Sequence, residues 1–302
     1  MTSSLPPVRE LQAAARRAWP ELRARKFEVH DGGWANLVLE ADGRAIFRFP
    51  RRREVAAGLG FEVRALGLLA RHLSLPVPRP TRLATLDRAA GWPFIAYPKL
   101  PGEPLSSIES LGPKGAHRLE SAVETLLREL AAIPPRSLLR FGATRGDPRS
   151  WAERFRRLEV RFARHGASLT PPALRRAIAD EFERFRSALS GGRYRAVATH
   201  RDLGPDHILW DSRAGRPTGV IDWEDLCLGD PAFDLTGLRP VGPTRFDRWV
   251  RQRRAPADST FDERLRFYRR IAPIHGVIHA AETGDHRWLR RFLPLLRANL
   301  LE

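Results

Sequence analysis

Three polar residues of this chain stand at spacings that suit the transfer of a phosphoryl group. Asp202 lies in a polar segment, His207 follows five residues later, and Asp222 comes twenty residues after Asp202, directly behind an apolar run. Phosphoryl transfer needs a carboxylate that orients the attacking hydroxyl and takes its proton, and ligands that hold Mg²⁺ against the phosphate oxygens. We therefore interpret Asp202 as a candidate catalytic carboxylate and His207 and Asp222 as candidate Mg²⁺ ligands.

Other charged residues near this group have competing interpretations. A His-Arg-Asp tripeptide occurs by chance on polar turns. The catalytic interpretation of Asp202 therefore depends on the presence of His207 and Asp222 at the right offsets. We expect His200 to be structural and not a base, and Asp234 to be a structural salt-bridge residue. A further set of acidic residues suits either a second cation, a cationic substrate or plain solvated charge, and it comprises Asp206, Glu224 and Asp225.

These segments also resemble a known family. Protein kinases place the same groups in H-R-D-x-x-x-x-N and D-F-G, whereas this chain has His207 in place of the Asn. The stretches 204–209 (GPDHIL), 221–223 (IDW) and 230–234 (DPAFD) resemble the aminoglycoside phosphotransferase family, which is similar in fold to protein kinases. The histidine variant resembles the aminoglycoside 2″-phosphotransferases and the macrolide 2′-phosphotransferases. The resemblance extends from about residue 26 to residue 290.

The resemblance implies a nucleotide site that takes ATP or GTP with Mg²⁺. Arg48 stands where the family carries its phosphate-binding Lys, and Glu62 stands where a helix carboxylate holds that cation. Arg and Lys are not interchangeable at such a position, so a catalytically weak pseudokinase that only binds nucleotide is an alternative. The remaining implied nucleotide contacts are the hinge residues Tyr97, Pro98 and Lys99 and the apolar residues Ile46, Leu209 and Ile221, which would sandwich the base.

Elements at these positions are expected from hydrophobic periodicity and turn signals. The Asp42-Gly43 pair favours a hairpin. The stretch 211–217 is turn-like, so segment 218–222 is expected to pair with 207–211 as a second hairpin. Strands are predicted at 26–30, 34–40, 45–49, 81–86 and 93–97, and helices at 8–18, 54–73, 113–133, 147–166, 172–190 and over 244–301.

The fold class expected from this order is α+β, a bilobal protein-kinase-like fold. Residues 1–100 would form a small antiparallel-sheet lobe that binds nucleotide, and the hinge would lie near 97–101. Residues 102–302 would form a larger, mostly helical lobe that carries the catalytic residues and binds the acceptor. Glu282 and Asp285 lie where relatives build part of the acceptor pocket, although both also suit a helix terminus.

Composition limits the partners and the compartment. The chain has 302 residues and a formal net charge of +17 that is spread along its length, without the clustering and recognition motif of a nucleic-acid binder. No apolar stretch is long enough for a membrane span, so neither nucleic acid nor membrane is expected as a partner. Cys227 is the only cysteine, which favours a cytoplasmic setting.

The function expected is transfer of the γ-phosphoryl group of ATP or GTP to a hydroxyl of an aminoglycoside-type antibiotic. A macrolide 2′-phosphotransferase or another small-molecule kinase is the alternative within the same chemistry. The net charge of +17 opposes a polycationic acceptor at long range, whereas local carboxylates outweigh that field at short range.

Overall fold

The computed structural model describes residues 5–86, 92–105, 107–191, 193–242 and 245–302. The chain divides into two compact units. Unit 1 comprises Met1–Ala143 and Gly204–Leu226, and unit 2 comprises Thr144–Leu203 and Cys227–Glu302. These units are each built from two separate segments of the chain, whereas the expected lobes are two consecutive segments that meet at 97–101. The expected lobe boundary therefore stays a prediction. Among the described residues, no helix combines the length and apolarity that a membrane crossing requires.

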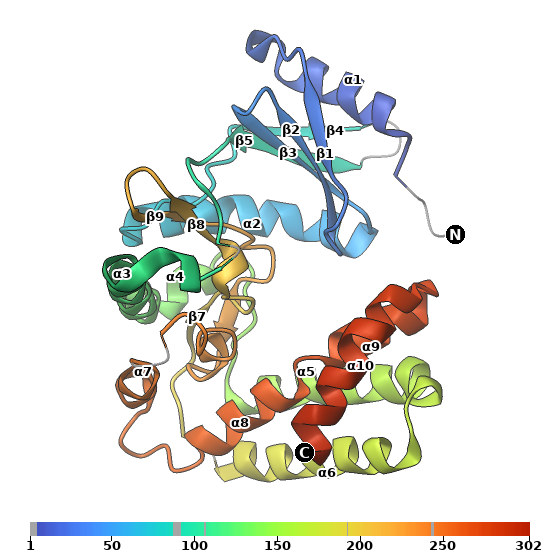
Figure 1. Cartoon of the computed structure of the whole chain (residues 1–302), viewed down its shortest axis with the longest axis vertical. Helices are drawn as coiled ribbons and strands as arrows, with labels where there is room; N and C mark the ends of the chain where they lie inside the picture. Colours follow the sequence, from blue (N-terminus) through green and yellow to red (C-terminus); the bar gives the residue numbers. More distant parts are fainter. Residues whose placement is uncertain (1–4, 87–91, 106, 192, 243–244) are drawn as a thin grey trace. The chain divides into compact units, whose positions relative to one another are not determined.

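Unit 1 contains a five-stranded antiparallel sheet of order β1-β2-β3-β5-β4 (Figure 1). Asp42 and Gly43 both have positive φ, 51° and 66°, as a tight hairpin between β2 and β3 requires. The predicted N-terminal strands are confirmed to within two residues at each end. The bounds are β1 (Phe27–His30), β2 (Asn36–Ala41), β3 (Ala45–Pro50), β4 (Arg82–Thr85) and β5 (Pro93–Pro98).

The two faces of this sheet are covered by different helices. Because successive strand residues point to opposite faces, Phe94 and Ala96 of β5 lie on one face, and Ile95 and Tyr97 on the other. Phe94 and Ala96 pack in one buried cluster with residues of α1 (Val8–Ala18). Ile95 and Tyr97 pack in a second cluster with residues of α2 (Arg53–His72). Figure 1 shows α1 and α2 on opposite sides of the sheet.

The remainder of unit 1 carries a hairpin formed by β8 (Ile208–Asp211) and β9 (Arg216–Val220). The antiparallel register pairs Ile208 with Val220, so the expected pairing of these segments is confirmed. β6 (Glu103–Pro104) adds a third strand beside β8. Two helices complete the unit, α3 (Gly112–Ala132) and α4 (Pro135–Leu139).

Unit 2 is mostly helical and has an aromatic core. Phe185 and Phe267 stack with ring centroids 3.9 Å apart at 9°, and they join α6 to α8. The two short strands of this unit pair with each other. The bounds are α5 (Pro148–Arg161), α6 (Pro172–Gly191), β7 (Val197–Thr199), β10 (Cys227–Gly229), α7 (Phe246–Arg253), α8 (Phe261–Ile271), α9 (Ile274–Thr283) and α10 (His286–Leu301).

The structure refines two helix predictions in unit 2. The predicted helix 147–166 ends as α-helix at Arg161 and continues as a π-turn over Phe162–Gly166. The helical region predicted over 244–301 is four helices. The break before α10 has a physical reason: Gly284 adopts φ 72° and Asp285 caps the next helix by accepting from the Arg287 N–H. Residue 244 lies outside the described part of the chain.

Candidate active site

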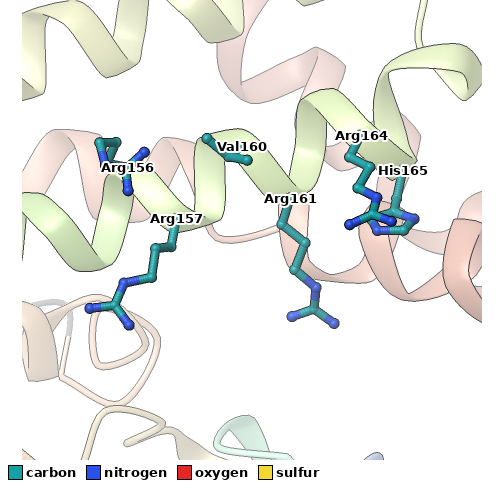
Figure 2. A pocket seen from close by; sticks show the side chains of 6 residues that line it. All are labelled: Arg156, Arg157, Val160, Arg161, Arg164 and His165. Atoms are coloured by element: carbon teal, nitrogen blue, oxygen red, sulfur yellow. The ribbon is translucent and has the colours of Figure 1, made fainter.

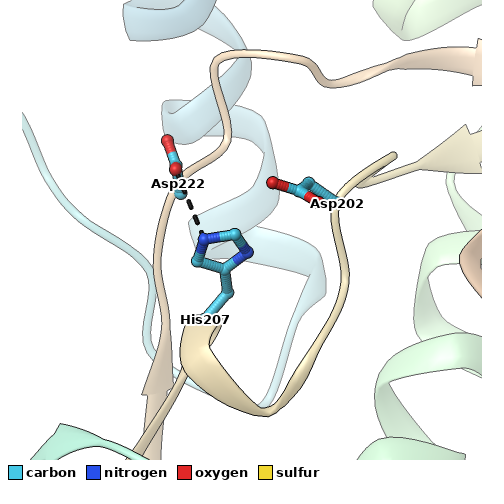
Figure 3. A group of neighbouring side chains, drawn as sticks. All are labelled: Asp202, His207 and Asp222. Atoms are coloured by element: carbon cyan, nitrogen blue, oxygen red, sulfur yellow. Dashed lines mark ion pairs between the residues drawn. The ribbon is translucent and has the colours of Figure 1, made fainter. Parts of the chain in front are cut away.

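Asp202, His207 and Asp222 lie together, as their spacing in the sequence predicts (Figure 3). Each offers a ligand atom, and these atoms all lie within 4.8 Å of one another. His207 Nε2 is 3.4 Å from Asp222 Oδ2. Figure 3 shows the three side chains pointing toward one another. Carboxylates suit Mg²⁺, and imidazole accepts several divalent metals, so this donor set fits a divalent cation.

The backbone before Asp202 is held in a strained conformation by its neighbours. Arg201 has φ 73°, a left-handed value that costs a non-glycine residue about 1–2 kcal/mol. The Arg201 N–H donates to Asp234 Oδ1 at 2.9 Å, and the His200 N–H donates to Asp234 Oδ2 at 3.0 Å. The Asp202 N–H lies 3.3 Å from His200 Nδ1. These contacts fit the structural role expected for His200 and Asp234.

Asp222 is placed by the hairpin. It follows β9, and the preceding Ile221 N–H donates to the His207 carbonyl at 3.0 Å, which extends the pairing to the two candidate ligands. Asp222 itself has φ 66°, a conformation that Asp tolerates better than most residues. The hairpin register and this turn together bring the Asp222 carboxylate to the His207 ring.

Arg48 lies in a buried cluster with two carboxylates. Its side chain is 6% exposed, and Nη1 donates to Glu62, whose side chain is 3% exposed. Nη2 donates to Glu224 Oε2 at 2.7 Å, and it lies 3.8 Å from Asp222 Oδ1. Asn36 Nδ2 also donates to Glu224. The expected pairing of Arg48 with Glu62 is present, while the contacts with Glu224 and Asn36 were not foreseen.

The charges in this cluster shift one another's pKa values. Burial alone would lower the pKa of Arg48, but Glu62 and the other anionic groups nearby outweigh it and raise that pKa above its ordinary value. Burial and then the Asp222 carboxylate raise the pKa of Glu224 to about 7, and Arg48 opposes this rise. Burial raises the pKa of Tyr97 to about 12. The cluster contains more carboxylates than its single guanidinium neutralises.

Comparison with known proteins identifies the family of this chain. A family model described as a phosphotransferase enzyme family matches residues 26–274. The chain belongs to this phosphotransferase enzyme family. It is 25% identical over 265 residues to a viomycin phosphotransferase of Streptomyces vinaceus, covering 86% of this chain and 89% of the relative.

Solved structures of related proteins share the fold of this phosphotransferase. The GDP complex of an aminoglycoside 2′-phosphotransferase-IIIa has a TM-score of 0.82 at 22% identity, covering 96% of this chain and 97% of the other. The macrolide 2′-phosphotransferase MphH from Brachybacterium faecium has a TM-score of 0.65 at 27% identity, with coverages of 95% and 97%. The expected family and the α+β kinase-like fold are therefore confirmed.

The segment expected to form the hinge, 97–101, has few unused backbone donors among the described residues. Pro98 and Pro101 have no N–H, and the Lys99 N–H already donates to the Arg44 carbonyl at 2.8 Å. The Lys99 side chain reaches Glu40 at 3.0 Å and Glu103 at 2.9 Å. Among the described residues, none accepts a hydrogen bond from the Leu100 N–H. Leu100 is therefore the backbone donor that this hinge still offers.

The apolar residues expected around the base lie in two parts of unit 1. Ile46 pairs across the sheet with Tyr97 and packs in the same cluster. Leu209 is buried in β8 opposite Gly219, and Ile221 follows the end of β9, half-buried.

A hollow of about 210 Å³ in unit 2 is lined by basic side chains along α5 and the following π-turn (Figure 2). Arg156 and Arg157 both pair with Glu153, and Arg161 pairs with Glu282. Two carboxylates, Glu153 and Glu282, thus compensate part of the charge of the four arginines in the hollow, and we assign the hollow no role in the reaction. Its lining residues are Arg156, Arg157, Val160, Arg161, Arg164 and His165.

Glu282 and Asp285, which lie where relatives build part of the acceptor pocket, both make contacts within unit 2. Glu282 pairs with Arg161 and lies 4.0 Å from His165, and Asp285 is the N-cap of α10. The helix-terminus interpretation of Asp285 is thus confirmed. The sequence did not predict that Glu224 and Asn36 belong to the Arg48 cluster. The position of Glu224 two residues after Asp222 is a usable signal, whereas nothing in the sequence indicates Asn36.

Proposed function

We propose that this phosphotransferase moves the γ-phosphoryl group of ATP or GTP directly onto a hydroxyl of a small-molecule antibiotic of the aminoglycoside type. The observation that carries the proposal is the convergence of Asp202, His207 and Asp222 within 4.8 Å. In this reaction the Asp202 carboxylate orients the acceptor hydroxyl and accepts its proton as the oxygen attacks phosphorus. Asp202 is exposed in the structure, as a group that meets substrate must be.

His207 and Asp222 are the residues proposed to hold Mg²⁺. Bound there with the nucleotide, the cation would neutralise negative charge on the phosphate oxygens. The hairpin contact from the Ile221 N–H to the His207 carbonyl keeps these two side chains at one place before any cation arrives. Positioning of this kind is the main protein contribution to phosphoryl transfer.

Arg48 is the proposed phosphate contact in unit 1. Glu62 holds one end of its guanidinium, so the other end is directed to a fixed place in spite of the long side chain. An arginine suits this task because its planar fork presents two donor ends at a fixed angle. The contact of Arg48 with Glu62 argues against the pseudokinase alternative, because the substitution of Arg for Lys leaves the ion pair intact.

The purine is proposed to bind along the hinge beside Tyr97, Pro98 and Lys99. The Leu100 N–H is the proposed backbone donor, because Pro98 and Pro101 have no N–H and the Lys99 N–H already donates to the Arg44 carbonyl. Ile46, Leu209 and Ile221 are the proposed apolar contacts with the faces of the base. This assignment refines the expected hinge contact and leaves ATP and GTP as alternative donors.

The proposed class of acceptor is inferred from the substrates named for related proteins. Aminoglycoside and macrolide 2′-phosphotransferases share the fold, and a viomycin phosphotransferase shares 25% of the sequence. We place an aminoglycoside first, because structures with kanamycin and gentamicin are described for relatives of the same fold. A macrolide hydroxyl is the second candidate, favoured by the identity of 27% to MphH and by the net charge of +17.

The proposal is tested by a transfer assay with Mg-ATP and Mg-GTP against aminoglycosides, viomycin and macrolides, in which the mass of the product is measured. Phosphorylated drug is expected from the wild type. Asp202→Asn, which keeps the shape and removes the base, is expected to lower kcat by about 10²–10⁴-fold. Equal kcat values for the two proteins would remove Asp202 from the proposed role, and nucleotide binding without transfer to any drug would favour the pseudokinase.

A further inference from the structure

The two ends of the Arg48 guanidinium contact carboxylates that differ in exposure and in secondary structure. Nη1 donates to Glu62, which is 3% exposed on α2. Nη2 donates at 2.7 Å to Glu224, whose side chain is 22% exposed and which lies in the turn after β9, outside any helix or strand. Glu62 is thus a buried residue of a helix, whereas Glu224 is a partly exposed residue of a turn.

Glu224 is held in place by a second donor. Asn36, at the start of β2, donates from Nδ2 to the same Glu224 oxygen that Arg48 contacts. Asn36 is 6% exposed, and its Oδ1 is buried without a hydrogen-bond partner among the described residues. A flipped amide would turn Oδ1 toward the carboxylate, so the observed orientation is set by Glu224. Two residues of unit 1 therefore converge on one carboxylate oxygen.

The Glu224 carboxylate accepts a hydrogen bond from the end of Arg48 that Glu62 does not use. A nucleotide phosphate is a hydrogen-bond acceptor as well, and it would approach the same Nη2 atom. Asp222 lies 3.8 Å from Nη2, so both free-end neighbours of Arg48 are carboxylates. One guanidinium end cannot make a short hydrogen bond of full strength to Glu224 and to a phosphate oxygen along the same direction.

We propose that Glu224 is a latch on Arg48, which occupies the phosphate-facing end of the guanidinium and is displaced when the nucleotide binds. The proposal rests on the phosphate-binding role of Arg48 given above. It makes Glu224 a residue that sets nucleotide affinity and positions Arg48, without contacting the transferred group. It also accounts for arginine at position 48, since the fork holds Glu62 at one end whether the other end carries Glu224 or a phosphate.

The test measures nucleotide affinity by titration calorimetry, without turnover, on wild type and Glu224→Gln. Gln keeps the shape and removes the charge. The ligands are ADP and GDP, with adenosine and guanosine as their phosphate-free counterparts, first in EDTA and then with Mg²⁺. Glu54→Gln is the matched control, because Glu54 is an exposed carboxylate in the first turn of α2 that makes no contact with Arg48.

In EDTA, Glu224→Gln is expected to bind the preferred diphosphate about tenfold more tightly than the wild type, the equivalent of losing one charge-assisted contact. Nucleoside affinity should not change, which also shows that the variant is folded, and Glu54→Gln should bind like the wild type. Equal or weaker diphosphate binding by Glu224→Gln in EDTA would overturn the latch. Weaker binding confined to Mg²⁺ would overturn it as well and assign Glu224 to the cation. If the wild type binds no nucleotide in EDTA or with Mg²⁺, the proposed function is overturned, and the latch is overturned with it.

Discussion

Arg48 shows how a buried charge is made tolerable at the residue scale. An arginine side chain that is 6% exposed would be costly to bury alone, and it is stabilised because charged partners lie around it. Glu62 is the partner that shares its buried position. Removing one member of such a pair leaves the other charge buried with less compensation, which costs more than the pair itself contributes.

The residue-scale prediction concerns Glu62→Gln. We expect the free energy of unfolding to fall by about 3 kcal/mol, because Arg48 then keeps only the Glu224 carboxylate at hydrogen-bond distance. Urea denaturation measures this change. Glu54→Gln on the same helix should change the free energy by no more than about 0.5 kcal/mol. A similarly small change in the free energy of unfolding for Glu62→Gln and Glu54→Gln would contradict this prediction and mean that Glu224 alone compensates the charge of Arg48.

At the scale of elements, the β8–β9 hairpin is attached to two segments, one that follows β5 and one that follows α2. The Thr218 hydroxyl donates to the Pro101 carbonyl at 2.5 Å, and the Val220 N–H donates to the Pro76 carbonyl at 2.9 Å. Gly102 allows the close approach: a Cβ there would lie 2.8 Å from the Trp210 carbonyl oxygen and 2.6 Å from Thr218 Oγ1. The hairpin that positions His207 and Asp222 therefore depends on a glycine outside it.

The element-scale prediction compares Gly102→Ala with Gly112→Ala. Both glycines have positive φ, 91° and 62°, so both substitutions incur backbone strain of about 1–2 kcal/mol. Only Gly102 lacks room for a Cβ, since nothing lies within 4 Å at Gly112.

Thermal denaturation should therefore show a clearly larger loss of stability for Gly102→Ala than for Gly112→Ala. The metal-dependent affinity for nucleotide should fall in Gly102→Ala alone, because the hairpin must shift. Equal losses in the two variants would show that strain dominates and that the close packing against Trp210 and Thr218 contributes little.

At the scale of the whole molecule, every tyrosine is buried and resists ionisation. The chain has three tyrosines. Burial raises the pKa of Tyr97 to about 12. Burial, followed by the Asp230 carboxylate, raises the pKa of Tyr194 and of Tyr268 above the ordinary value. Tyr268 also donates to Asp230 at 2.6 Å, a bond that tyrosinate cannot make.

The molecule-scale prediction follows from proton linkage. Above a pH of about 10 the unfolded chain releases tyrosine protons that the folded chain retains, so the free energy of unfolding falls as pH rises. The slope is up to about 1.4 kcal/mol per pH unit for each tyrosine, and below pH 10 the contribution is constant.

Tyrosinate absorbance at alkaline pH tests this prediction. It should stay low near pH 10 and rise together with loss of tertiary structure, and Tyr268→Phe should make the pH slope of stability shallower. Ionisation of a tyrosine near pH 10 in the folded protein would contradict the prediction.

Sequence alone determined the order of elements, the family and the group of Asp202, His207 and Asp222. Hydrophobic periodicity and turn residues are local signals, and the three site residues lie within one short stretch that a single hairpin closes. Periodicity did not predict how the C-terminal helical region divides, because caps such as Asp285 and left-handed turns such as Gly284 separate segments that all have helical spacing.

Only the tertiary structure decided what surrounds Arg48 and which hinge donor is free. Glu224 lies 176 residues from Arg48 and 188 from Asn36 along the chain, and no local pattern reports a contact at that separation. The Lys99 N–H is likewise used by Arg44 through strand pairing, which leaves Leu100. Contacts of this kind depend on how distant segments pack, since burial and partner geometry, rather than residue type, determine which charged groups meet.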